Sequence, residues 1–575
     1  MKIEKITINN FRSILKGEFY ISDILCIVGA NNSGKSAILK ALNSYFNFEE
    51  EKQNFISGTH QYSVKSVAKI EITFNNLPSK SLYNSKLNKD KTLSLQAVYY
   101  SNGTKIKYNY KKGAKYIETD DILIQEIKKD FQYVLIPLNR DHNQIVTSEK
   151  TILKQVIDAY LKIQKKRDTL TPKVIDAKEY LIKNALTKVA GDIADKYLHN
   201  RNFEIEIDFT KIIDYKLLID DLQISINEKG NIFPISECGS GIQSLMIIAL
   251  YNYYSSLNNN NILFGIEEPE TNLHPQSQKE FLNQITKGVL NSNNNQLIMT
   301  THSPVLIDKL DHLDVVVTNK IKDPKRGFRT ELYQLPKDFW SKYGFEEFKY
   351  NTFYKYKNSD FFFSKLVIVV ESKTDAEVFR ELLNVNNIDL DDEGISFLTL
   401  DGIGNFTYAF YLLKEIKIKK LFILDKDFFF DYLTDNKENS RDTAGFYKYK
   451  KTFKQLDIIN SLINVNSDRV NLEKLFHSNL SKASNILEKY DTICMSYNLE
   501  MDLIASSFAR NELFKIFNIN PTNHTPQELL INNKKKIKKP EVLIPLVSKI
   551  PPKNLPNSYN KIRKLVKQKI SELNK

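Results

Sequence analysis

The chain is poor in cysteine: its 575 residues include only Cys26, Cys238 and Cys494, which lie far apart in the sequence. This spacing provides neither a disulfide framework nor the paired cysteines of a zinc ribbon. We therefore interpret the three thiols as small core or loop residues of a protein in a reducing compartment.

Long hydrophobic runs are also missing. No stretch of about 18 apolar residues occurs, so the sequence predicts no membrane-spanning helix and no membrane partner. The residues after Met1, KIEKITINNFRS, lack the apolar core of a signal peptide. Together these two absences predict a cytoplasmic protein.

What the sequence does contain is typical of a folded protein, with 42% hydrophobic and 26% charged residues. A chain of this length is expected to form about three domains. The 82 Lys and Arg residues outnumber the 69 Asp and Glu residues and give a net charge of +13. This excess favours a polyanionic partner such as nucleic acid, although a lysine-rich genome produces the same balance.

The stretch GANNSGKS, residues 29–36, follows an apolar run at 24–28 and precedes a segment with helical spacing. A strand, such a loop and a helix form the context of a P-loop. Its glycines let backbone N–H groups face a triphosphate, Lys35 adds a positive charge, and the Ser36 hydroxyl can ligate Mg²⁺. The residues predicted to bind the cofactor ATP here are Gly29, Asn32, Gly34, Lys35, Ser36 and Ala37.

The middle of the chain changes from strand patterns to helix patterns. Residues from about 60 to 138 form short strand-like segments, which we interpret as a β-rich insertion in an ATPase core. Two helical stripes follow, at 152–161 and 180–197, and Thr171 with Pro172 is predicted to start the second helix. A helical hairpin is expected. It fits either packing within the ATPase or dimerisation through a protruding arm, and we favour dimerisation.

Three further motifs follow in an informative order. SECGSGIQSL places Ser240 in a glycine-flanked turn at a helix start, where backbone N–H groups bind anions. The apolar strand ILFGI then ends in Glu267 and Glu268, as in a Walker B pair that holds the Mg²⁺ shell and orients the attacking water. His302 follows another apolar strand, in QLIMTTHSP.

The order of these motifs resembles the ABC-type ATPase head of SMC and RecF-like proteins, in which NFRS near the start also recurs. In that family the signature motif of one head completes the ATP site of another, so ATP binding drives head engagement. The resemblance implies that Glu267 fills the Walker B position and that Glu268 is the hydrolytic base. It also implies that Ser240 contacts the ATP bound to a second head, and that His302 is the switch residue, which contacts the γ-phosphate. The signature departs from the usual LSGGQ, and no long coiled coil follows.

From residue 365 strands and helices alternate again, which predicts a compact parallel-sheet domain. Acidic residues follow its strands, at the sheet edge where ligands bind in open α/β folds. Like charges repel unless a cation neutralises them, and oxygen ligands favour Mg²⁺ or Mn²⁺. The candidate carboxylates are Glu371, Asp375, Asp425, Asp427, Glu500 and Asp502.

This arrangement resembles a Toprim domain, with a Glu after the first strand, the DGIGNF turn and the DKD pair. A fusion of an ABC-type head to Toprim, with the later LEMDL element, resembles the OLD (overcoming lysogenization defect) family of ATP-dependent nucleases. GajA-like defence nucleases and the OLD effectors of some retrons are relatives. The resemblance implies an ATP-regulated endonuclease that cuts or nicks DNA with two metal ions in antiviral defence. It also implies that Asp375 ligates directly or through water, and that Lys539 in KKIKKPEVL is a late catalytic lysine.

The sequence thus predicts an α/β protein that forms a homodimer or a higher oligomer. Its expected parts are the ATPase N-terminal part with the β insertion (1–147), the helical hairpin (148–200), the ATPase C-terminal part (201–345), a linker (346–364) and the Toprim domain with C-terminal helices (365–575). Primase is disfavoured by the missing zinc-ribbon cysteines, and topoisomerase by the lack of a companion tyrosine domain. Three alternatives stay open: an effector held inactive by a partner RNA or protein, an RNA-cleaving Toprim nuclease, and a DNA-clamping ATPase that does not cut.

Overall fold

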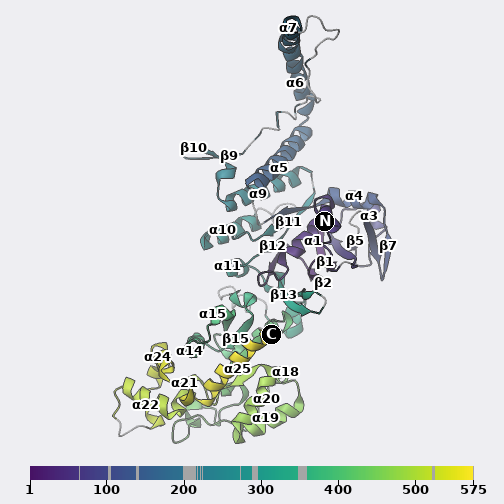
Figure 1. Ribbon diagram of the computed structural model, residues 1–575. Helices are drawn as coiled ribbons and strands as arrows, with labels where there is room; N and C mark the ends of the chain where they lie inside the picture. Colours follow the sequence, from purple (N-terminus) through teal and green to yellow (C-terminus); the bar gives the residue numbers. More distant parts are fainter. Residues whose placement is uncertain are drawn as a thin grey trace. The chain divides into compact units, whose positions relative to one another are not determined.

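The computed structural model divides the chain into two compact units, Met1–Gln334 and Leu335–Lys575 (Figure 1). It describes residues 1–63, 65–100, 105–137, 142–197, 224–258, 260–271, 273–287, 295–324, 326–346, 359–520 and 525–573, with a few isolated residues between 207 and 222. None of the described helices has the length and apolar character that crossing a membrane requires.

The first unit is built on a twelve-stranded sheet in the order β7-β6-β5-β4-β1-β2-β14-β13-β3-β12-β11-β8. Strands β8, β11, β12, β3 and β13 run parallel. The carboxyl-terminal ends of β3, which precedes the P-loop, and of β11, which ends in Glu267, therefore lie on the same side of the sheet. The bounds are β1 (Lys2–Phe11), β2 (Ile14–Tyr20), β3 (Ile24–Val28), β4 (Ala68–Asn75), β5 (Leu93–Tyr99), β6 (Ile106–Lys112), β7 (Lys115–Glu118), β8 (Phe131–Ile136), β11 (Asn261–Glu267), β12 (Gln296–Thr300), β13 (Val315–Asp323) and β14 (Gly327–Gln334).

The β-rich insertion predicted for about 60–138 is part of this sheet. Strands β4 to β7 extend it in antiparallel order beyond β1, and β8 forms the opposite edge beside β11. Helix α1 packs its apolar side against β1, β4 and β8 in one core. The helices and the small hairpin of this unit are α1 (Lys35–Phe46), α2 (Phe48–Ile56), α3 (Ser81–Asn84), α4 (Asp121–Asp130), α5 (His142–Ile163), β9 (Ser225–Glu228), β10 (Asn231–Pro234), α9 (Ser240–Asn258), α10 (Pro275–Ile285) and α11 (Pro304–Ile307).

The predicted helical arm differs from the expectation in two ways. Helix α6 (Arg167–Leu181) begins after Lys165, whose φ of 53° makes the turn, so Thr171 and Pro172 lie inside the helix rather than at its start. The Thr171 hydroxyl donates to the Arg167 carbonyl within that helix. The π-helix η1 (Ile182–Leu186) and helix α7 (Thr187–Tyr197) then continue α6 as one rod, which Figure 1 draws as an extension of α5 rather than a return along it. Neither α6 nor η1 contains a buried residue.

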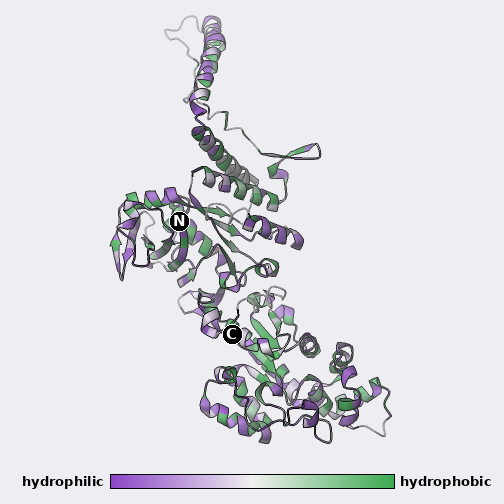
Figure 2. Ribbon diagram, turned by 180° about the vertical axis from the view of Figure 1, so that it is seen from behind, coloured by the Kyte–Doolittle hydropathy of each residue, from purple (hydrophilic) through white to green (hydrophobic). Residues whose placement is uncertain are grey.

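The second unit has a four-stranded, fully parallel sheet in the order β16-β15-β17-β18. Its strands are largely buried, as is typical of parallel sheets covered by helices, and Figure 2 shows them in the hydrophobic colour. The bounds are α12 (Phe339–Tyr343), β15 (Leu366–Val370), α14 (Lys373–Asn384), α15 (Leu390–Glu393), β16 (Ile395–Thr399), α16 (Phe406–Glu415), β17 (Lys420–Leu424), α17 (Lys426–Phe429), α18 (Asp457–Leu462), α19 (Asn466–Ser478), α20 (Leu480–Leu487), β18 (Thr492–Cys494), α21 (Leu499–Ala505), α22 (Ser507–Ile516), α23 (Lys534–Ile537), α24 (Pro540–Lys549) and α25 (Asn557–Leu573).

The aromatic segment around α12 belongs to this second unit. Trp340 stacks on Tyr408 with ring centroids 5.7 Å apart, and Tyr343 stacks on Tyr411 at 3.9 Å. Both partners lie on α16, so residues 335–346 belong to the second unit, whereas the sequence predicts that the ATPase part extends to residue 345. At the other end, α25 buries Ile562, Leu565, Val566 and Ile570 and so packs its apolar side on the domain.

Candidate functional site

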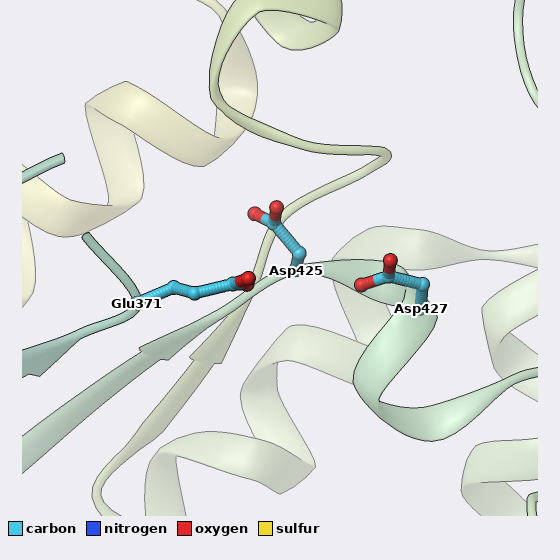
Figure 3. Close-up of side chains that lie close together, drawn as sticks. All are labelled: Glu371, Asp425 and Asp427. Carbon is cyan, nitrogen blue, oxygen red and sulfur yellow. The ribbon is translucent and has the colours of Figure 1, made fainter. Parts of the chain in front are cut away.

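Three carboxylates meet at the carboxyl-terminal edge of the second sheet (Figure 3). Glu371 follows β15, whereas Asp425 and Asp427 follow β17, and these two strands are parallel neighbours. One oxygen of each side chain lies within 4.8 Å of the other two. Ligand oxygens around one divalent cation are at most about 5 Å apart, so the cluster has the size of a metal site.

The electrostatics of the cluster also favour a cation. Burial raises the pKa of Asp425 well above its usual range, and the neighbouring acidic side chains, Asp375 first among them, raise it further. Burial likewise raises the pKa of Glu371, with repulsion from Asp427 adding to the effect. Crowded carboxylates resist ionisation unless a positive charge compensates them. These hard oxygen donors therefore fit Mg²⁺ or Mn²⁺ better than zinc.

The DGIGNF turn supports Glu371 from the neighbouring strand. The Gly402 N–H donates to the Glu371 carbonyl at 3.3 Å, and Gly402 has a φ of 119°, which a side chain rarely tolerates. The Asn405 side chain donates to the Leu400 carbonyl at 2.8 Å and closes the turn. The turn therefore fixes the backbone from which the Glu371 carboxylate projects.

Asp375 has a structural role that the sequence interpretation missed. Its Oδ2 accepts hydrogen bonds from the Ser372 backbone N–H at 2.8 Å and from the Ser372 hydroxyl at 2.7 Å. Together the two residues form a capping box at the start of α14. The spacing of Ser372 and Asp375 is the sequence signature of such a cap. Asp375 lies outside the group of three carboxylates but still acts on Asp425 electrostatically.

The LEMDL element lies in α21, which follows the edge strand β18. Glu500 Oε1 accepts from the Asn498 side chain at 3.3 Å, and the Glu500 charge raises the pKa of Asp425. Asp502 is only 1% exposed, and its two oxygens accept from the backbone N–H groups of Ser496 and Tyr497, both at 2.8 Å, and from the Ser558 hydroxyl at 2.5 Å. Burial raises the pKa of Asp502 to about 6 despite these donors. The two acidic residues thus have different surroundings.

The lysine beside these acids is Lys538. Its Nζ lies 2.8 Å from Glu500 Oε1. Burial lowers the Lys538 pKa, but the attraction of Glu500 and Asp425 outweighs burial and raises it overall. Lys539, which the family resemblance singled out, is instead the residue that precedes α24, with Pro540 at the first helical position. A run of adjacent lysines gives no periodicity from which this difference could have been predicted.

Two threonines on neighbouring strands, Thr318 and Thr330, form hydrogen bonds with Ser33 in the P-loop of the first unit. The Ser33 hydroxyl lies 2.5 Å from Thr318 Oγ1 on β13, and Thr330 Oγ1 on β14 donates to the Ser33 carbonyl at 2.7 Å. A Cβ atom at Gly34, whose φ is 103°, would lie 2.3 Å from Thr330 Oγ1. The Lys35 ammonium donates to two carbonyls of the loop at 3.1 Å. The loop is therefore preformed and closely packed.

The acidic strand and the histidine lie at the same sheet edge as the P-loop. Glu267 ends β11, and Glu268 Oε1 lies 3.6 Å from His302 Nε2. Burial lowers the pKa of Lys35, whereas Glu268 and Glu270 raise it. The charges of Glu268 and Glu270 therefore reach the P-loop lysine.

Glu270 is a further residue of this site that the sequence interpretation left out. Its Oε1 accepts from the His302 backbone N–H at 2.6 Å, which connects the end of β11 to the end of β12. Burial raises the pKa of Glu270. The third acid of EEPE is the signal that could have identified it. Of the other predicted contacts, Ser36 and Ala37 lie in the first turn of α1, and Asn32 has a φ of 58° in the loop. Ser240 begins α9, but its side chain lies outside the described residues.

Fold and sites together define a class of protein: a P-loop ATPase unit followed by an acidic, metal-binding α/β unit. The chain matches the family described as AAA ATPase domain over residues 1–170 and 132–307. It also matches the overcoming lysogenization defect protein-like TOPRIM domain over residues 362–427, which include all three clustered carboxylates. The chain belongs to the AAA ATPase domain family, whose model covers more than half of it, and its second unit matches the OLD-like TOPRIM domain, the combination that the family resemblance predicts. The predicted fold class is confirmed, and the domains imply the use of a nucleotide and a divalent metal.

The chain is also similar to three proteins named as nucleases, each over part of its length. The chain is 30% identical over 288 residues to endonuclease GajA of Bacillus cereus (strain HuB5-5), which is 46% of this chain and 40% of that protein. It is 23% identical over 218 residues to the OLD nuclease of Thermus scotoductus, 36% of this chain and 39% of the relative. The Old nuclease of Escherichia phage P2 is 25% identical over 36% of each chain. The chain thus spans between 36% and 40% of the length of these relatives.

Solved structures give a weaker likeness. An Smc head bound to the C-winged helix domain of ScpA aligns with 59% of this chain and 99% of the solved one, at a TM-score of 0.38 and 15% identity. The family assignment rests instead on the two domain matches.

Proposed function

We propose that this chain is a metal-dependent endonuclease that cuts or nicks DNA, and that ATP at the first unit regulates the cutting. The observation that carries the proposal is the cluster of Glu371, Asp425 and Asp427 inside the match to the OLD-like TOPRIM domain. Relatives named as an endonuclease and as nucleases agree with it, and the GajA relative favours a role in antiviral defence. The excess of basic residues fits a nucleic-acid partner.

The three clustered carboxylates would hold Mg²⁺ or Mn²⁺, and Glu500 and Asp375 would add negative charge beside them. When bound, a pair of such ions would supply an activated water and would neutralise charge on the attacking and leaving oxygens of a phosphodiester. Asp502 is better suited to positioning, because three donors already occupy its two oxygens. Through these hydrogen bonds, Asp502 would fix the start of α21 and thereby position Glu500, which lies in the same helix.

Lys538 supplies a fixed positive charge at the border of the same site. We assign to it the role that the resemblance implied for Lys539, namely stabilising the negative charge that develops on the phosphate. Its ion pair with Glu500 orients the ammonium while no substrate is bound.

At the first unit, the P-loop residues from Gly29 to Ala37 would bind the triphosphate of ATP, with Ser36 and Glu267 on its Mg²⁺. Glu268 would activate water, and His302 beside it would sense the outermost phosphate. Ser240 would complete the site of a second copy, so we propose a homodimer or higher oligomer. The exposed apolar side chains of the arm, such as Ile175, Tyr180 and Val189, favour the arm as part of that contact.

The proposal is tested by incubating supercoiled plasmid with the purified full-length chain and Mg²⁺ or Mn²⁺, with and without ATP. We expect nicked or linear DNA with metal and none with a chelator. Cleavage of tRNA but not of plasmid would replace DNA by RNA as the substrate. DNA binding without cleavage under every metal condition would favour a clamping ATPase. Activity that appears only when a co-purifying RNA or protein is removed would identify an effector held inactive by a partner.

The two adjacent lysines provide a matched pair of variants. Lys538→Met is expected to lower the cleavage rate ~100-fold, because it removes one charged donor from the reacting phosphate. Lys539→Met removes the same charge one residue away and is expected to retain near wild-type cleavage. Rates measured at saturating Mg²⁺ decide between them. A larger loss in Lys539→Met would return the role to Lys539.

A further inference from the structure

Asp427 has a hydrogen-bond partner beyond the acidic cluster: the Tyr432 hydroxyl donates to Asp427 Oδ2 at 2.7 Å. Asp427 lies in α17, a helix of only four residues that follows β17. Such a short helix contributes little rigidity of its own. The orientation of the Asp427 carboxylate therefore depends on groups outside that helix.

Tyr432 is itself firmly held. Its ring stacks on Tyr449 with centroids 5.3 Å apart and meets the ring of Tyr447 edge-on at 5.0 Å. The backbone around it pairs with the segment that carries these rings, because the Leu433 N–H donates to the Lys448 carbonyl at 3.0 Å and the Lys450 N–H to the Asp431 carbonyl at 2.9 Å. The position of the hydroxyl is thus set by two paired segments.

The Tyr432 hydroxyl occupies one oxygen of the Asp427 carboxylate. A phenol O–H can donate, and a carboxylate can only accept, so the direction of this hydrogen bond is fixed. A donor on one carboxylate oxygen leaves the second oxygen available for a metal, and one Asp427 oxygen points towards Asp425 in Figure 3. Partners of this kind orient metal-binding carboxylates in many proteins.

We propose that Tyr432 is a positioning residue that holds Asp427 in its metal-binding orientation. This role rests on the proposed function of the acidic cluster, and it extends the site to the segment that follows α17. Tyr432 does not touch the substrate or the reacting atoms in this proposal. It acts through Asp427, so its removal weakens metal binding.

The test compares Tyr432→Phe with Tyr449→Phe in the full-length chain. Both changes keep an aromatic ring in the same stack, and only the first removes the donor to Asp427. Tyr432→Phe is expected to raise the Mg²⁺ concentration for half-maximal cleavage about 10- to 100-fold, with the rate recovering at high Mg²⁺. Tyr449→Phe is expected to match the wild type. An unchanged Mg²⁺ requirement in Tyr432→Phe, or a lost rate that excess metal does not restore, would overturn the proposal.

Two further measurements separate this positioning role from a role independent of Asp427 and from a nucleophilic one. In an Asp427→Ala background, which removes the acceptor, adding Tyr432→Phe is expected to change the affinity for Mn²⁺ no further, since the tyrosine acts through Asp427. An additional loss would contradict the proposal. A covalent DNA–protein adduct that disappears in Tyr432→Phe would also contradict it, by making the tyrosine a nucleophile.

Binding of Mn²⁺, followed by calorimetry without DNA, keeps the inference independent of the nuclease assignment. If the wild-type chain cuts no nucleic acid, the proposed function fails. Weaker Mn²⁺ binding by Tyr432→Phe than by Tyr449→Phe still supports the positioning role, and equal binding by the two variants refutes it.

Discussion

Replacing Asp425 by asparagine is expected to abolish metal-dependent DNA cleavage while ATP hydrolysis continues. Asp425 is a member of the three-carboxylate cluster, and the other acidic side chains raise its pKa, so its charge depends on a compensating cation. Asparagine keeps the shape of the side chain and removes its charge. Loss of a metal ligand worth ~4 kcal/mol in the transition state corresponds to a rate decrease of about 1000-fold. Initial rates of plasmid nicking at saturating Mg²⁺ measure the effect.

Unfolding must be distinguished from loss of the metal. In a chelator, Asp425→Asn is expected to melt at the wild-type temperature or above it, because the substitution removes like-charge repulsion from the cluster. Adding Mg²⁺ should raise the melting temperature of the wild type and not of the variant, since only the wild type binds the ion. Asp431→Asn, an exposed site in the same segment, is the matched control and should cut normally. Cleavage by Asp425→Asn at the control rate would exclude this cluster as the catalytic centre.

Replacing Lys35 by alanine is expected to lower ATP binding and hydrolysis ~100-fold and to make DNA cleavage independent of ATP. The Lys35 side chain is buried beneath the loop, and its ammonium donates to two carbonyls from which it can move to phosphates. The loop also rests on Thr330 of β14, the strand that ends at Gln334, where the first unit ends. A change in the loop therefore acts directly on the strand that leads into the second unit.

The measurement is cleavage with and without ATP, alongside nucleotide binding. Lys52→Ala, which removes an exposed lysine from α2, serves as the control and should keep the wild-type response. Cleavage without ATP is expected to be equal in Lys35→Ala and the wild type if the ATP site regulates the reaction. A Lys35→Ala variant that no longer binds ATP yet keeps the wild-type response to it would exclude coupling through this site.

The P-loop could be predicted from the sequence because its determinants are local. A buried strand, the residues from Gly29 to Ser36 and an amphipathic helix follow one another directly, so no distant contact is needed to specify them. The alternation of strands and helices in the second unit was predictable for the same reason. Since parallel strands end at one edge, the meeting of Glu371 with Asp425 followed from the order of the strands.

Other features depend on contacts that a sequence pattern does not encode. Lys538 and Lys539 are adjacent in the turn between α23 and α24, and the course of this turn brings the Lys538 side chain to Glu500. The sequence pattern does not distinguish these two lysines. Whether an acidic side chain binds a metal or instead accepts hydrogen bonds from the backbone depends on the donors around it. Asp502 has such donors on both oxygens. The Tyr432 contact likewise depends on the paired segments at 431–433 and 448–450.

The rod of α6 and η1 has a consequence for local stability. Among its residues, 167–186, none is buried, Pro172 removes one helical hydrogen bond, and η1 departs from α-helical pairing. A solitary helix of about this length is only marginally stable in water. Its amide hydrogens should exchange rapidly with solvent in a single copy and slowly once a second copy covers the apolar side chains. If two copies associate through the rod, the exchange protection of these backbone amides should rise with protein concentration, so amide exchange alone would report the association.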